Sequence, residues 1–145
     1  MTALADAQLR RQLLEAARIA GTRLYLPHGA VVGMESLLET RSVWREVRIT
    51  FRKPATSIDG AGPAEADEQL LFEGSVREIT SRFPRSVNAM VACALATVGL
   101  DATRARMYAD RRLGEVLRGE FEFIGSNGAR LTIIKEPPDQ LGHQP

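Results

Sequence analysis

The chain has 145 residues, with a hydrophobic content of 44% and a charged content of 26%, which predicts one globular domain able to bury a core without cross-links. The formal net charge of +1 gives no general attraction to nucleic acid or to a membrane surface, so we expect neither partner. No apolar run is long enough to span a bilayer, and the first residues do not resemble a signal sequence. We therefore expect a cytoplasmic protein.

The first third of the chain predicts two helices and two strands. Residues 6–20 form an amphipathic pattern, with Asp6 as the N-cap and Gly21 as the stop. Residues 23–26 are predicted as a short apolar strand, residues 27–30 as a turn, and residues 32–40 as a second helix. Residues 42–52 alternate between apolar and polar side chains, which predicts a strand with one buried face. The apolar face of the first helix comprises Leu9, Leu13, Ala16, Ala17 and Ala20.

The middle of the chain is predicted to carry the central element. Residues 55–68 hold glycines, a proline and acids, so we expect a mobile surface loop, followed by a strand over 69–72. Ser75 and Glu78 have the spacing of a capping box, and Pro84 must end the helix that they begin. A second helix runs from Asn88 to Val98 and is almost wholly apolar, which predicts a buried central helix ended by Gly99. The single cysteine, Cys93, excludes an internal disulfide and is expected to be a buried structural residue.

The last third predicts strands at residues 105–109, 120–124 and 129–134. The last two are joined through Asn127-Gly128, a strong hairpin signal. Residues 137–145 are expected to be a disordered tail after a single domain at 1–136. The whole pattern predicts an α+β fold, with a mixed or mostly antiparallel sheet and helices mainly on one face.

Several motifs occur in a fixed order over about a hundred residues. They are Pro27-x-Gly29-Ala30-x-x-Gly33, Arg52-Lys53-Pro54, Gly74-Ser75-x-Arg77-Glu78, Phe83-Pro84-x-x-x-Asn88 and Gly99-Leu100-Asp101-x-Thr103-x-x-Arg106. This order resembles the C-terminal domain of the L-aspartate dehydrogenase family. The resemblance implies a domain that supplies a substrate pocket, catalytic groups and a dimer interface.

In that family a separate Rossmann domain holds the dinucleotide. This chain has no Gly-x-Gly-x-x-Gly fingerprint, in which glycines let the backbone approach a pyrophosphate. We therefore expect the chain alone to bind neither NAD nor NADP, and expect NAD(P) only with a separate Rossmann partner. The family's catalytic histidine falls at Arg118 or Gly119, and neither residue can act as an acid or base near neutral pH.

The resemblance assigns two contacts to the cofactor, Ala30 and Asn88. For Ala30 the alternative is a small residue in a tight turn, and for Asn88 it is a helix cap. His28 and Lys53 are the candidate catalytic residues, because an imidazole acts near pH 7 and a lysine at a strand end suits a polar pocket. An exposed turn histidine is the alternative for His28. Candidate substrate contacts are Gly29, Arg77, Arg85 and Ser86, and a solvent-facing position is the alternative for Arg77.

No cluster has the spacing of a metal site. Three functions stay open: a homodimeric protein that binds a small carboxylate and has a non-redox activity of isomerase, lyase or cyclase type, the substrate subunit of an NAD(P)-dependent dehydrogenase that works with a Rossmann chain, and an inactive dimeric scaffold. If a small molecule binds, we expect it where the turn at 27–30, Lys53 and the helix entrance at 85–88 converge, because a helix N-terminus and a lysine both attract an anion.

Overall fold

A computed structural model describes residues 1–27, 31–58, 60–62 and 66–136. His28, Gly29 and Ala30, and the predicted tail at 137–145, lie outside the described residues. The helices are α1 (Ala7–Ile19), α2 (Met34–Glu39), α3 (Val76–Arg82) and α4 (Asn88–Ala96), with short 3₁₀ helices η1 (Thr2–Ala5), η2 (Ala55–Ser57) and η3 (Arg111–Leu113). The strands are β1 (Trp44–Lys53), β2 (Glu68–Ser75), β3 (Arg104–Asp110), β4 (Arg118–Gly125) and β5 (Arg130–Lys135).

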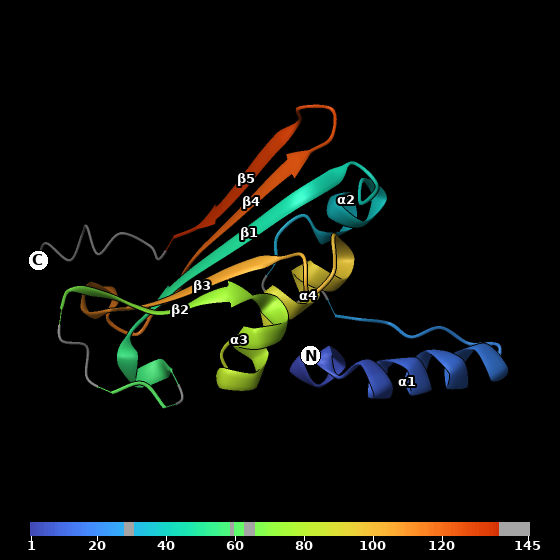
Figure 1. The fold of residues 1–145 in the computed structure, drawn as a ribbon, viewed down its shortest axis with the longest axis horizontal. Coiled ribbons are helices and arrows are strands. Elements are labelled where there is room, and N and C mark those ends of the chain that lie inside the picture. Colours follow the sequence, from blue (N-terminus) through green and yellow to red (C-terminus); the bar gives the residue numbers. More distant parts are fainter. Residues whose placement is uncertain (28–30, 59, 63–65, 137–145) are drawn as a thin grey trace, which may run out of the picture.

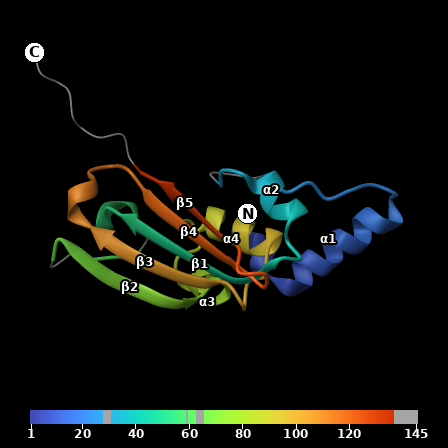
Figure 2. The ribbon, with the colours of Figure 1, turned by 90° about the horizontal axis from the view of Figure 1, so that it is seen from above.

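The strands form one sheet in the order β2-β3-β1-β4-β5. Only the central β1–β3 pair is parallel, and the other three pairs are antiparallel. Helices α2, α3 and α4 lie on one face of this sheet and leave the other face open, while α1 extends away from the sheet at the edge of the molecule (Figures 1 and 2). The predicted α+β fold, with a mixed and mostly antiparallel sheet, is therefore confirmed.

The core lies between the sheet and α4. Alternate residues of β1, β3 and β4 are buried on the helix face, and Val47, Met107 and Phe123 are at most 1% exposed. Against them packs α4, in which Met90, Val91 and Cys93 have no exposed surface. A helix that is apolar on all sides is stable only when it is covered on all sides. The prediction of a buried central helix is confirmed.

The ends of the central helices follow their sequence signals. The Ser75 side chain and the Glu78 side chain form the predicted capping box at the start of α3. After α4, Gly99 has a φ of 91° and its amide donates to the Ala94 carbonyl at 2.8 Å, which closes the helix. The hairpin between β4 and β5 also forms at the predicted Asn127-Gly128 turn.

Three sequence predictions need correction. Residues 23–26 are not a strand, because no neighbouring strand pairs with their backbone within the described chain. The segment at 55–68 is not wholly a surface loop: it begins with η2, and Ile58 is 3% exposed in the core. Asn88 is not the cap of α4, because Val87 holds that position and no side chain caps the helix.

Candidate functional site

The structure has a hollow of about 350 Å³ on the helix face of the sheet, at the end of β1. We call it the Lys53 hollow. Its polar side chains come from the end of β1 and from the entrance to α4. Its apolar wall includes Phe51, Ala92 and Leu117. The polar lining residues are Lys53, Arg85, Ser86 and Asn88.

Strand alternation places Lys53 in this hollow. Val47, Ile49 and Phe51 are buried on the helix face of β1, and Lys53 is the next residue on that face. It stands where the core ends, half-buried, and Pro54 then ends the strand. Its Nζ donates to the carbonyl of Ser86 at 3.0 Å, which joins the strand end to the helix entrance.

Ser86 is buried just before the start of α4. It is 6% exposed, its amide donates to the Phe83 carbonyl at 3.1 Å, and its Oγ donates to the Ser57 carbonyl at 3.5 Å. The turn set by Phe83-Pro84 therefore fixes the carbonyl that Lys53 contacts. Ser86 acts mainly through its backbone in this geometry.

Asn88 is the first residue of α4, and its side chain is exposed. The Oδ1 atom accepts a hydrogen bond from the amide of Thr2 at 3.2 Å. This contact ties the first residues of the chain to the rim of the hollow, so that Met1 also lines it. Asn88 keeps its amide nitrogen available for other contacts, since only its oxygen has this role.

Among the described residues, the charged side chains that line the Lys53 hollow are all cationic. Lys53 and Arg85 are cationic, and none of the described residues that line the hollow is acidic. The free amides at the N-terminus of α4 add to the positive potential. Such a site favours an anion, and above all a carboxylate, which accepts charge-assisted hydrogen bonds from a lysine or an arginine.

Arg118 and Gly119, the two positions at which the resemblance places the family's catalytic histidine, lie near this hollow at the start of β4. Gly119 pairs with Phe51 across β4 and β1, and a Cβ built on Gly119 would meet Phe51 Cε1 at 3.3 Å. Position 119 therefore faces the same wall as Phe51. Arg118, on the other side of the strand, pairs with Glu136 at 3.1 Å.

The predicted site residues divide into three groups. The structure brings Lys53, Arg85, Ser86 and Asn88 together around one hollow, which Pro27 also lines. His28, Gly29 and Ala30 lie outside the described residues. Arg77 is elsewhere: its guanidinium pairs with Asp101, which raises the Arg77 pKa, and Nη1 donates to the Ala5 carbonyl at 2.9 Å. Its position supports a structural ion pair and gives no support to a substrate contact.

Sequence reasoning missed the apolar wall. Phe51 could have been found, since strand alternation places it on the same face as Lys53. Leu117 follows η3 with no periodic signal of its own. Its place in the apolar wall depends on the pairing of β4 with β1, which no local pattern indicates.

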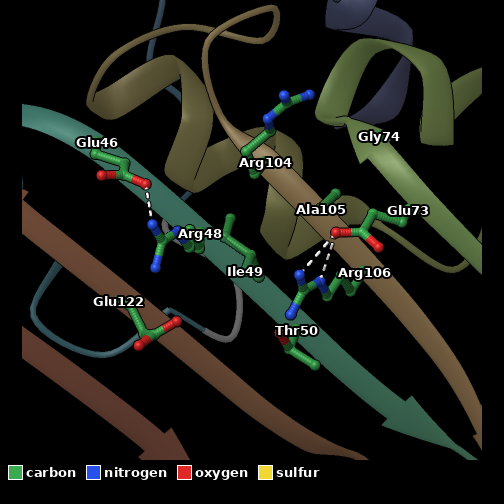
Figure 3. Close-up of a pocket in the computed structure, with 10 residues that line it drawn as sticks. All are labelled: Glu46, Arg48, Ile49, Thr50, Glu73, Gly74, Arg104, Ala105, Arg106 and Glu122. Carbon is green, nitrogen blue, oxygen red and sulfur yellow. Dashed lines mark hydrogen bonds and ion pairs between the residues drawn. The ribbon is translucent and has the colours of Figure 1, made fainter.

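A second hollow of about 660 Å³ lies over the open face of the sheet. Figure 3 shows that charged side chains of both signs line it, and dashed lines join some of them in pairs. Arg48 pairs with Glu46, and Arg106 pairs with Glu73 at 2.7 Å. Each of these two cations of the larger hollow therefore already has a carboxylate partner.

Within the described ranges, no group of three His, Cys, Asp or Glu side chains is placed to hold a metal ion. No helix in the described part of the chain has both the length and the apolar character needed to cross a membrane.

Known proteins are similar to this chain in sequence and in fold. The family model described as "Aspartate dehydrogenase, C-terminal" matches residues 37–141. The chain therefore belongs to the family of aspartate dehydrogenase C-terminal domains. The L-aspartate dehydrogenase 1 of Bordetella pertussis is 39% identical over 144 residues, and the L-aspartate dehydrogenase of Methanosarcina barkeri is 35% identical over 150 residues.

The crystal structure of aspartate dehydrogenase from Thermotoga maritima matches the fold with a TM-score of 0.80 and 25% identity. The match covers 93% of this chain and 55% of that chain. The coverage of the two sequence relatives is similar: the matches cover 94% and 93% of this chain and 55% of each relative. The chain thus spans about half the length of the relatives that it matches.

Proposed function

We propose that this chain recognises a small carboxylate, of the size and charge of L-aspartate, in the Lys53 hollow. The observation that carries the proposal is the charge of the lining: Lys53 and Arg85 stand at its rim and none of its described lining residues is acidic. The ligand class also agrees with the relatives, which are named L-aspartate dehydrogenases.

Hydrogen bonds from two polar side chains and an apolar wall would hold the ligand. Lys53 Nζ, already directed at the Ser86 carbonyl, would donate a further hydrogen bond to one carboxylate. The Asn88 amide nitrogen would orient a second polar group at the entrance to α4. Phe51 and Leu117 would exclude water from one side, which strengthens the electrostatic contacts.

A non-redox activity of isomerase, lyase or cyclase type belongs to the same proposal. Such a reaction needs a group that can give and take a proton near the substrate. Among the described lining residues, Lys53 is the side chain that can do so, because a guanidinium keeps its proton in proteins. We therefore assign any such step to Lys53 Nζ.

A redox function with a nucleotide-binding partner is the second candidate. It is favoured by the names of the relatives, which are L-aspartate dehydrogenases. In this case NAD or NADP would be held by the partner. The Lys53 hollow would still present the carboxylate substrate.

We also propose that two copies pair through the open face of the sheet. This face exposes residues of both charges, such as Arg48, Arg106 and Glu122 around the hollow in Figure 3. A two-fold axis would place each sign opposite the other, as an isologous interface requires. Sedimentation at micromolar concentration should give a dimer, and the charge reversals R48E and R106E together should give a monomer. A wild-type monomer would contradict this assignment.

Thermal-shift and calorimetric titration with L-aspartate, L-malate and succinate tests the carboxylate proposal. The variant Lys53→Met should weaken binding by about ten- to a hundredfold, because a hydrogen bond to a charged group contributes about 1.5–3 kcal/mol. The matched control is Lys135→Met, which removes the only other lysine, exposed at the end of β5. Equal affinities of the two variants, or no binding by the wild type, would refute the proposal.

A further inference from the structure

The Lys53 hollow has two sides of different chemistry. Its cations, Lys53 and Arg85, stand where β1 ends and α4 begins, whereas most of its described lining residues are apolar. Sites for small organic molecules commonly have this composition, in which a few polar groups orient the ligand and apolar side chains cover the rest of it. L-aspartate is polar at both ends and has no group that would contact such a wall. The apolar lining residues are Met1, Pro27, Phe51, Ala89, Ala92 and Leu117.

Phe51 forms a fixed part of the apolar side. It lies two residues before Lys53 on the same face of β1, which separates their Cα atoms by roughly 7 Å. Its ring packs edge-on against Phe121, with 5.8 Å between the ring centroids, and Phe51 is only 2% exposed. Gly119 leaves room for the ring, because a Cβ there would meet Phe51 Cε1 at 3.3 Å. The packing therefore holds apolar surface close to the cations.

Leu117 reaches the same wall from the connection between β3 and β4, and it is half-buried against the core. The connection is anchored at its start. Asp110, which is buried, accepts hydrogen bonds from the Arg112 amide at 3.0 Å and from Arg112 Nε at 2.9 Å. Arg112 Nη2 also donates to Glu68 of β2 at 3.0 Å. A wall that is held in place before a ligand arrives reduces the ordering that binding requires.

We propose that the Lys53 hollow binds an amphipathic monocarboxylate, which has one carboxylate and a short branched aliphatic or aromatic group. The carboxylate accepts hydrogen bonds from Lys53 Nζ and from the Asn88 amide nitrogen, and the apolar group packs on Phe51 and Leu117. Leu117 is the residue that sets the specificity, because it adds apolar surface without a charge or a hydrogen-bond donor. The inference rests on the proposed function for the carboxylate contact, and it adds the chemical class of the rest of the ligand.

NMR titration of the full chain with acetate, butanoate and 4-methylpentanoate tests the proposal. The affinity should rise by about twofold to fourfold for each added carbon, because a fully buried CH₂ group contributes about fourfold. 4-Methylpentanamide has the same apolar group without the charge. It should bind at least about tenfold more weakly than the acid, because it loses a charge-assisted hydrogen bond.

Variants of two neighbouring residues locate the apolar group. Leu117→Ala should lower the ratio of the 4-methylpentanoate affinity to the succinate affinity by about fivefold or more, because it removes apolar contact and keeps both cations. Leu117→Asn keeps the size of the side chain and should lower this ratio as well. Val116→Ala truncates the preceding residue, which is outside the described lining, and should change neither affinity. A merely structural role of Leu117 would weaken both ligands alike and would leave the ratio constant.

The inference is overturned if the affinity does not rise along the acid series, or if the amide binds as tightly as the acid. It is also overturned if folded Leu117→Ala keeps the wild-type ratio, or if Val116→Ala lowers the ratio equally. The wild-type series decides the inference even if a Leu117 variant does not fold, which its thermal melt shows.

Titration with L-aspartate in parallel separates this inference from the proposed function. A chain that binds L-aspartate and shows no rise along the acid series overturns this inference alone. A chain that binds 4-methylpentanoate and not L-aspartate overturns only the proposed size and charge of the ligand. A chain that binds neither overturns both.

Discussion

Two helices of this chain, α1 and α4, have opposite surroundings. Both are predicted well from the sequence, and both are rich in alanine and larger apolar residues. In α4 Met90, Val91 and Cys93 have no exposed surface, whereas no residue of α1 is buried. Periodicity indicates that a helix forms and which side is apolar. It does not indicate whether the structure that covers that side lies within the same domain.

The largest expected difference between α4 and α1 is in the loss of stability when one large side chain is truncated in each helix. Met90→Ala leaves a cavity in the core and should lower the free energy of unfolding by about 2–5 kcal/mol. Leu13→Ala, in α1, should change it by no more than about 0.5 kcal/mol. Urea denaturation followed by circular dichroism measures both. Similar losses in the two variants would show that α1 is part of the cooperative core.

The helix caps provide a second contrast. Ser75→Ala breaks the capping box that joins β2 to α3 and should cost about 0.5–2 kcal/mol of global stability. Asp6 caps α1 through the amides of Gln8 and Leu9, at 2.8 and 3.0 Å. Asp6→Ala should therefore fray α1 and reduce the helical signal, with little change in the denaturation midpoint. A midpoint shift as large as that of Ser75→Ala would contradict the comparison.

The dependence of stability on acidic pH should also differ between the core and α1. The Arg112 side chain, with its backbone amide, holds the pKa of Asp110 below its usual value of 3.8. The ionised Asp110 therefore adds stability at pH values above 3.8, and this is lost as the pH falls through the lower folded-state pKa. Asp110→Asn should flatten the dependence of the melting temperature on pH below about pH 4. Asp6→Asn, on the uncovered helix, should leave that dependence as in the wild type.

The last expected difference between the two helices is in the reactivity of a cysteine thiol. Burial raises the pKa of the Cys93 thiol to about 12, so almost no thiolate is present at neutral pH. A thiol reagent such as DTNB should not label the native chain and should label it fully in urea. A cysteine placed at Ala16 of α1 should react at once without denaturant. Rapid labelling of Cys93 in the native chain would show that α4 is not tightly packed.

The sequence predicted most of the fold because its signals are local. Ser75 and Glu78 set the start of α3, Gly99 sets the end of α4, and Asn127-Gly128 sets the hairpin. The failed strand at 23–26 has a physical reason, since a strand is defined by a neighbour that no local pattern can supply. The segment does contain the apolar residues Leu24, Tyr25 and Leu26, but within the described chain no strand pairs with its backbone.

For the candidate site, the sequence predicted the polar part and missed the apolar wall. Lys53 and the entrance at 85–88 could be paired because strand alternation and a helix start both have local signals. The contacts of Arg77 with Asp101 and of Asn88 with Thr2 depend on how distant segments meet. Such contacts follow from the topology of the whole fold, which periodicity alone does not determine.

The carboxylate proposal, which is the central claim, is tested most directly by mapping L-aspartate on the isotope-labelled chain by NMR. The two hollows lie on opposite faces of the sheet, so their amide signals distinguish them. We predict saturable shifts confined to Lys53, to Ser86 through Ala92 and to Leu117, and lost in Lys53→Met. Shifts centred on Arg48 and Arg106 over the open face, or no saturable shifts, would contradict the account.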